Sequence, residues 1–142
     1  MRALIVDDSS FVREYLRHLL DHMGIASEEA VDGSDAIATL TARRDFDLML
    51  LDVNMPVMNG LECVKALREA KLNPEMKVMM VTTEADNSFI ATALDNGADE
   101  FLMKPFTPES LREKMMLLGF AGIGLTVRRR AGRGREAWLT AA

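Results

Sequence analysis

The chain has a single cysteine, Cys63, and no apolar run long enough to cross a membrane. One cysteine excludes an intrachain disulfide and favours a reducing compartment. A spanning helix needs about 20 consecutive apolar residues. The first apolar run meets two aspartates by position 8, which is too early for a secretory signal peptide. We therefore expect a cytoplasmic protein with no membrane partner.

Positive charge is scarce over most of the chain. Residues 119–142 hold five arginines and one glutamate, a net +4, so residues 1–118 carry −9 and the whole chain −5. An acidic body argues against nucleic-acid binding by the domain itself, because phosphate backbones require a basic surface. The five glycines of 119–142 predict a basic, disordered or loosely attached tail after a domain spanning 1–118. The alternative is a basic arm that docks on an acidic partner or on this domain's own acidic face, or that binds DNA.

Apolar residues, in contrast, make up 49% of the 142 residues, enough for one domain with a buried core. Short apolar runs alternate with segments of helical spacing, which predicts parallel βα units and an α/β fold. The predicted strands are 3–6, 25–30, 47–52, 77–81 and 101–103. Five helices are predicted. The first begins after a cap at Ser9 or Ser10, the next three cover 36–40, 61–67 and 88–96, and the last begins at Pro108 after an N-cap at Thr107. A turn is predicted at Asp32-Gly33.

Carboxylates follow two of the predicted strands. Asp7 and Asp8 come directly after the first strand, and Asp52 ends the third. Ligands of open α/β sheets bind outside the carboxyl ends of the strands, and crowded carboxylates repel one another unless a positive charge joins them. Because all these ligands are oxygens, the sequence predicts a Mg²⁺ site at this edge.

Two further polar positions lie at the same predicted edge. Thr82 and Thr83 end the fourth strand, and Lys104 follows the fifth. A carboxylate can attack phosphorus, and a cation and a lysine can neutralise phosphoryl oxygens. The set therefore indicates phosphoryl transfer.

Four blocks in order resemble the receiver domains of response regulators, in particular the single-domain, CheY-like ones: Val6-Asp7-Asp8, Leu51–Pro56 with Gly60, Val81–Glu84, and Phe101–Phe106. The resemblance covers residues 2 to about 118. It implies a flavodoxin-like (βα)5 fold, a doubly wound five-stranded parallel sheet with strand order 2-1-3-4-5. It also implies a two-component signalling protein rather than an enzyme.

The resemblance assigns roles to the strand-end residues. Asp52 would accept a phosphoryl group from a histidine kinase, and Mg²⁺ would be bound by Asp8, Asp52 and the carbonyl of Asn54, with Asp7 assisting through water. Lys104 would pair with the phosphoryl group, or with Asp52 before phosphorylation, and the Lys104–Pro105 bond would be cis. Thr82 and Phe101 would be the switch residues, although Phe101 as simple core packing is a rival interpretation.

Further expectations concern lifetime and output. By the same resemblance, Asn54 and Glu84 would occupy the positions that tune dephosphorylation, and their polar character resembles that of regulators that lose phosphate rapidly. A downstream protein would bind the surface formed by roughly 87–118, with chemotaxis as the leading pathway and a monomer or weak dimer as the working form. Two alternatives remain: a Mg²⁺-dependent phosphohydrolase using Asp52 as nucleophile, which would want an aspartate where Asn54 stands, and a phosphorylation-independent adaptor.

Other residues receive simpler interpretations. His18 and His22 have metal-ligand spacing but no supporting pattern, so they are expected to face solvent. Cys63 is expected in the core. Methionines on the predicted strands are expected in the core, namely Met49, Met79, Met80 and Met103. Met115 and Met116, on the last predicted helix, are expected at the surface.

Overall fold

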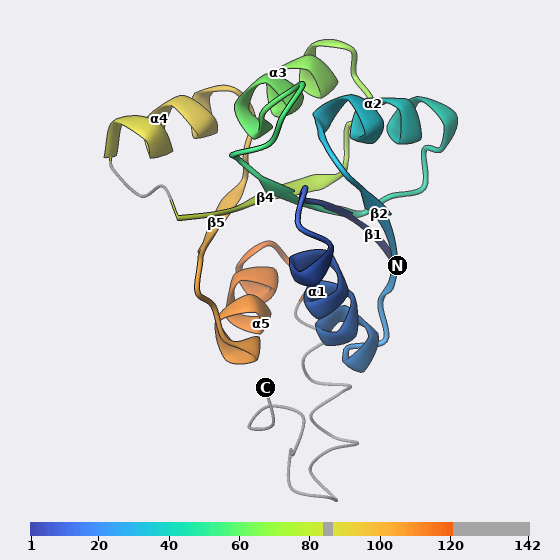
Figure 1. Ribbon diagram of the computed structural model, residues 1–142, viewed down its shortest axis with the longest axis vertical. Coiled ribbons are helices and arrows are strands. Elements are labelled where there is room, and N and C mark those ends of the chain that lie inside the picture. The colour runs from blue at the N-terminus through green and yellow to red at the C-terminus, as the bar shows by residue number, and fades with distance from the viewer. Residues whose placement is uncertain (84–86, 121–142) are drawn as a thin grey trace, which may run out of the picture.

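A computed structural model describes residues 1–83 and 87–120 (Figure 1). In this part of the chain five strands alternate with five helices, and all neighbouring strands are parallel in the order β2-β1-β3-β4-β5. The predicted fold is therefore confirmed. The elements are β1 (Arg2–Val6), α1 (Ser10–His22), β2 (Ala26–Ala30), α2 (Gly33–Ala42), β3 (Leu48–Asp52), α3 (Gly60–Glu69), β4 (Lys77–Thr82), α4 (Asn87–Asp95), β5 (Glu100–Met103) and α5 (Pro108–Leu117).

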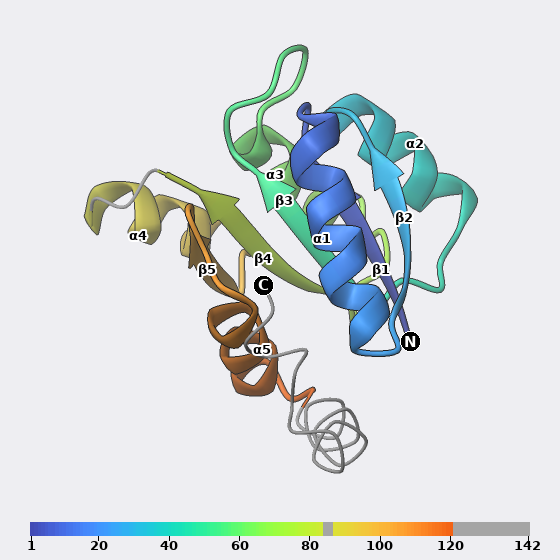
Figure 2. The same ribbon diagram turned by 60° about the horizontal axis from the view of Figure 1, so that its bottom comes forward.

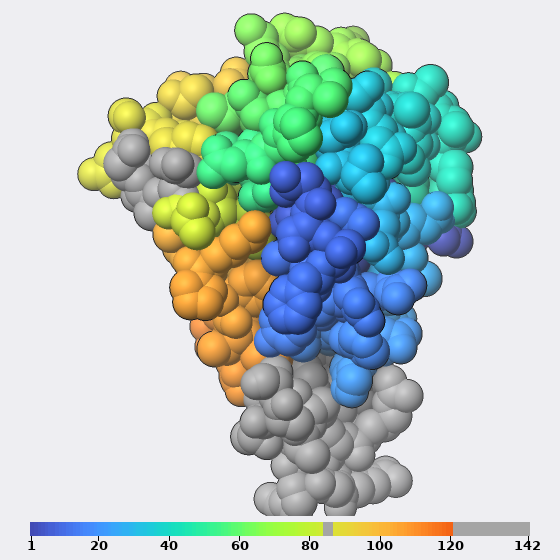
Figure 3. All heavy atoms as spheres, viewed as in Figure 1, coloured from blue at the N-terminus to red at the C-terminus, as the bar shows by residue number. Residues whose placement is uncertain are grey.

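Helices cover both faces of the sheet. Helices α2, α3 and α4 lie on one face, and α1 and α5 lie on the other (Figure 1). In the space-filling view of Figure 3, the atoms of α2 and α3 lie above those of α1 and α5. Every residue of β3 is buried, as expected for a central strand that packs helices on both faces. The edge strand β2 is polar in the middle, with Ser27, Glu28 and Glu29, which fits its weak sequence signal.

Polar caps fix where the helices begin. Ser9, rather than Ser10, caps α1, and its side chain accepts a hydrogen bond from the backbone N–H of Val12. Asp32 does more than form the predicted turn, because it caps α2. Thr107 caps α5 and Pro108 is the first residue of that helix, as predicted. Each of these caps accepts from a backbone N–H in the first turn of its own helix and so fixes where that helix begins.

Gly60 holds the end of β3 close to α3. Its N–H donates to the carbonyl of Val53 at 2.9 Å, and a Cβ at this position would collide with the carbonyl oxygen of Asp52. A glycine is therefore required for this approach. The contact places Asp52 firmly at the edge of the sheet.

The methionine predictions were wrong at two positions. Met103 on β5 is 40% exposed, whereas Met115 on α5 is buried with 1% exposure. Met49, Met79 and Met80 are buried as predicted, and so is Cys63. None of the helices in the described part of the chain is long and apolar enough to cross a membrane.

Candidate functional site

Three carboxylates meet where β1 and β3 end. Val6 pairs with Leu51 in adjacent parallel strands, so Asp7 and Asp52 follow at neighbouring positions. Oxygens of Asp7, Asp8 and Asp52 all lie within 4.8 Å of one another. Asp7 is 2% exposed and Asp52 is 6% exposed, whereas Asp8 is exposed. The predicted acidic cluster is therefore present, with two buried members and one at the surface.

Lys104 joins the two buried carboxylates. Its Nζ lies 3.1 Å from Asp7 Oδ2 and 3.3 Å from Asp52 Oδ1. Its backbone N–H donates to the carbonyl of Thr82 at 2.9 Å, which places Lys104 beside the end of β4. The Lys104–Pro105 bond is cis, as the resemblance implied. The predicted pairing with Asp52 is present, and the pairing with Asp7 is additional.

Crowding of charge shifts the protonation of this site. Burial, and then the negative charge of Asp7, raise the pKa of Asp52 above its usual value, although Lys104 opposes them. Burial disfavours the charged form of Lys104, but the hydrogen bond and charge of Asp7, followed by the charge of Asp52, raise the pKa of Lys104. Lys104 therefore stays protonated at neutral pH.

The cluster fits a hard divalent cation. Among the described residues, it is the one group of three or more His, Cys, Asp or Glu side chains with this convergence. All three donors are carboxylates, the ligands preferred by Mg²⁺, whose bonds to oxygen are about 2.0–2.1 Å long. Because one donor is exposed, an ion has access from solvent. The start of α1 and the β3–α3 loop lie at this same end of the sheet (Figure 2).

The remaining predicted site residues lie in different surroundings. Thr82 is fully buried at the end of β4. Phe101 on β5 is partly buried, and its ring lies edge-on to that of Phe89 on α4, with centroids 6.0 Å apart. Asn54 follows β3 and is exposed. Glu84 lies outside the described residues, as does the predicted tail beyond Phe120.

The sequence analysis missed three partners of Asp7 and Asp52, two at their carboxylates and one at a backbone carbonyl. The N–H of Ser9 donates to Asp7 Oδ1 at 2.8 Å, and the N–H of Val53 donates to Asp52 Oδ1 at 2.9 Å. Arg13 donates to the carbonyl of Asp7 at 2.7 Å. The two N–H donors could have been expected from the strand-to-loop position. Arg13 carried no signal of its own, because an arginine near the start of a helix usually faces solvent.

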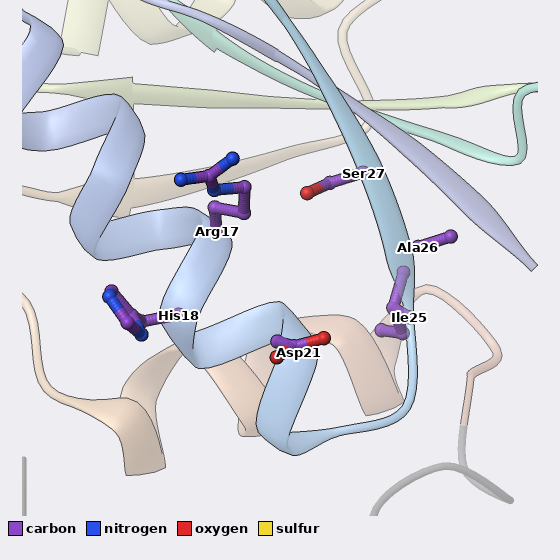
Figure 4. Close-up of a pocket in the computed structure, with 6 residues that line it drawn as sticks. All are labelled: Arg17, His18, Asp21, Ile25, Ala26 and Ser27. Atoms are coloured by element: carbon purple, nitrogen blue, oxygen red, sulfur yellow. The ribbon is translucent and has the colours of Figure 1, made fainter.

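A separate hollow lies between α1 and the start of β2 (Figure 4). His18 lines it and is exposed, as is His22, in agreement with the prediction that both face solvent. The hollow lies toward the opposite end of the sheet from the acidic cluster, since β2 begins there. It is lined by Arg17, His18, Asp21, Ile25, Ala26 and Ser27.

Fold and site together define an open α/β protein with an acidic centre at the carboxyl edge of a parallel sheet. The sequence model of the response regulator receiver domain family matches residues 3–116. The chain therefore belongs to this family. It is a CheY-like response regulator of two-component signal transduction, and this assignment is favoured over the phosphohydrolase and the adaptor.

Named relatives support the assignment. The chain is 41% identical over 116 residues to a chemotaxis protein CheY homolog of Campylobacter jejuni, covering 81% of this chain and 89% of the relative. It is 39% identical to chemotaxis protein CheY1 of Helicobacter pylori, and the match covers 81% of this chain and 94% of the relative. The structure of Vibrio cholerae CheY4 superposes with a TM-score of 0.76 at 38% identity, covering 81% and 95%. A chain in the structure of the CheX-CheY-BeF3-Mg+2 complex of Borrelia burgdorferi superposes with a TM-score of 0.78 at 26% sequence identity. The match covers 83% of this chain and 88% of that chain.

Proposed function

We propose that Asp52 accepts a phosphoryl group from a histidine kinase and that the modification switches a protein-binding surface. The observation that carries this proposal is the buried carboxylate of Asp52 at a strand end, 3.3 Å from Lys104 and within 4.8 Å of two further carboxylates. A carboxylate oxygen of Asp52 attacks phosphorus, and the phosphorus–nitrogen bond to the donor imidazole breaks. The product is an acyl phosphate on Asp52 and a histidine that takes up a proton.

Mg²⁺ is the proposed cofactor of this step. Asp8, Asp52 and the backbone carbonyl of Asn54 would hold it, with Asp7 assisting through a bound water. When bound, the ion neutralises the charge of the phosphoryl oxygens. The carboxylate cluster supports this assignment, because three acidic groups within 4.8 Å provide an all-oxygen ligand set.

Lys104 supplies the second positive charge. Its ammonium already lies between Asp7 and Asp52, so a small movement brings it to a phosphoryl oxygen while Asp7 remains within reach. Three donors on the ammonium allow both contacts at once. Lys104 thereby orients the acceptor before transfer and stabilises the added charge afterwards.

The switch is proposed to run from Asp52 through β4 and β5. Phosphorylation adds a charge of about −1.5 to −2. Thr82 lies beside Lys104 at the end of β4 and would donate its hydroxyl hydrogen to the phosphoryl group. Phe101 packs on Phe89 of α4, so a change in its packing would alter the surface of roughly 87–118. That surface exposes Leu94, Met103 and Leu117.

The chemotaxis proteins among the relatives support the pathway part of the proposal. We propose a cytoplasmic receiver domain over residues 1–118, a monomer or weak dimer, that signals in chemotaxis and whose only chemistry is its own phosphorylation and dephosphorylation. We also propose that Asn54 and Glu84 favour rapid loss of phosphate. A phosphorylated lifetime of hours would contradict that part.

Intact mass measured after incubation with acetyl phosphate and Mg²⁺ tests the central claim. One added phosphoryl group is expected, and it should be absent in Asp52→Asn and after chelation. Asp21→Asn is the control, because it removes an exposed carboxylate of α1 outside the cluster. Label that persists in Asp52→Asn would overturn the proposal. Many turnovers per second of a small phosphomonoester would support the phosphohydrolase instead.

A further inference from the structure

Arg13 connects the acidic cluster to the edge strand. Its Nη1 donates to the carbonyl oxygen of Asp7 at 2.7 Å, and its Nε donates to Glu29 Oε1 at 2.9 Å. The side chain is only 14% exposed, although it belongs to the first turns of α1. Glu29 lies on β2, where it pairs with Ile5 of β1. A single guanidinium therefore ties together α1, β2 and the residue that follows β1.

The contact fixes the backbone on which Asp8 is carried. The carbonyl of Asp7 belongs to the planar peptide that joins Asp7 to Asp8. The N–H of Asp7 donates to Ala30 at 3.2 Å, which anchors the other side of the same residue. With both ends of Asp7 held, the direction in which the chain enters Asp8 is set. Since the Asp8 side chain is exposed, its approach to Asp52 depends on this backbone rather than on core packing.

We infer that Arg13, held by Glu29, is a positioning residue for divalent-cation binding: it orients the Asp7–Asp8 peptide so that the Asp8 carboxylate faces Asp52. This inference rests on the proposed cation site and deepens it. Arg13 does not contact the ion. It acts through a backbone carbonyl, as outer-shell partners of metal sites do, and loss of such partners weakens binding by roughly 10- to 100-fold.

Electrostatics alone predicts the opposite sign. Arg13 carries a positive charge close to the cluster, so its removal should strengthen the binding of a cation if charge were its only effect. A positioning role predicts weaker binding when the same charge is removed. The direction of the change therefore separates the two explanations.

Arg13→Lys and Arg13→Met test the inference, with Arg17→Lys and Arg17→Met as matched controls. Lysine keeps the charge but lacks the planar fork that donates to two oxygens in fixed geometry. Arg17 lies one turn further along α1 and also pairs with Glu29, at 3.6 Å, but the described contacts to the Asp7 carbonyl come from Arg13. The two lysine variants thus match each other in charge, as do the two methionine variants, and within each pair only the position differs.

The full chain is titrated with MgCl2, and binding is monitored through the amide NMR signals of Asp8 and Asp52. Thermal unfolding without metal checks that each variant is folded. Both Arg13 variants should bind Mg²⁺ roughly tenfold more weakly than the unaltered chain, and both Arg17 variants as tightly or slightly more tightly. If Arg13→Met fails to fold, Arg13→Lys decides. Unchanged or tighter binding by the Arg13 variants would overturn this inference alone. No saturable binding by the unaltered chain would overturn the proposed cation site as well.

Discussion

Replacing Asp52 by asparagine should stabilise the folded protein in the absence of Mg²⁺. Burial and the charge of Asp7 raise the pKa of Asp52, which means that the ionised carboxylate costs free energy in the folded state. Asparagine removes this charge with little change in shape. Its side-chain oxygen can still accept from the N–H of Val53 and from Lys104, the two donors that Asp52 has.

The size of the effect is a small difference between larger opposing quantities. At an effective dielectric constant of about 20, a pair of opposite charges 3.3 Å apart, as for Lys104 and Asp52, attracts by about 5 kcal/mol. Like charges 4.8 Å apart, the outer limit for the carboxylate oxygens, repel by about 3.5 kcal/mol each. Asp7 contributes this repulsion, and burial of the Asp52 charge, the largest cause of its raised pKa, adds a further cost. With burial added, repulsion exceeds attraction, and we expect a gain on the order of 1 kcal/mol, or a melting temperature higher by about 3 °C.

The pH dependence has a definite sign. The folded-state pKa of Asp52 is raised above the ordinary value of 3.8. The unaltered protein therefore loses stability as pH rises from 3.8 through the folded-state pKa, because the folded form resists ionisation. Asp52→Asn does not suffer this loss. Its advantage should be largest at neutral pH and should vanish as pH falls below 3.8, where Asp52 is protonated in both the folded and the unfolded chain.

Thermal unfolding with EDTA, at neutral and acidic pH, measures this advantage. Asp21→Asn, an exposed change on α1, should stay within about 0.5 kcal/mol of the unaltered chain. Added Mg²⁺ should reverse the order, since a ligand at ten times its Kd stabilises the unaltered protein by about 1.4 kcal/mol and a neutral amide at this position is a poorer ligand than a carboxylate. A lower melting temperature for Asp52→Asn in EDTA at neutral pH would refute the reasoning.

Two further predictions concern Lys104 and Cys63. Lys104→Met leaves two buried carboxylates without their shared cation. Unfolding in urea should show that the free energy of unfolding falls by about 2 kcal/mol or more and that Mg²⁺ largely restores it. Equal stability of this variant with and without Mg²⁺ would contradict the assigned geometry. Burial, aided by the charge of Asp32, raises the pKa of the Cys63 thiol to about 12, so a chromogenic disulfide reagent at pH near 8 should label Cys63 only as fast as the chain unfolds; rapid labelling of the folded protein would show that the thiol is accessible.

The sheet and its acidic edge could be predicted because their signals are local. A buried parallel strand is a short apolar run, and the residue after it must lie at the carboxyl edge, so Asp7, Asp52 and Lys104 converge for topological reasons. Errors arose where burial depends on a neighbour. Met103 belongs to β5, at the end of the sheet, and is 40% exposed, whereas Met115 turns into the core between α5 and the sheet.

Arg13 could not be found from sequence for a related reason. Its spacing in α1 is that of an ordinary polar position, and its partners are the carbonyl of Asp7 and the carboxylate of Glu29, which lies 16 residues later on β2. A long, flexible side chain reaches partners that no periodic pattern encodes. The same holds for the second contact of Lys104, because a pairing with Asp52 alone was expected and the structure adds Asp7 at 3.1 Å.

The charge of the cluster gives the proposed phosphorylation a reason to use both a lysine and a cation. Three carboxylates and the protonated Lys104 leave a net −2, which would repel an incoming phosphoryl group. A bound divalent cation would bring the net charge of the cluster to zero. Phosphorylation would then replace the −1 of the Asp52 carboxylate with about −2, so that the net charge of the cluster becomes about −1. Loss of Lys104 or of the cation leaves transfer facing net negative charge, so both should slow phosphorylation. Because Lys104 is held by the carboxylates before any ion arrives, only its loss should also destabilise the metal-free fold.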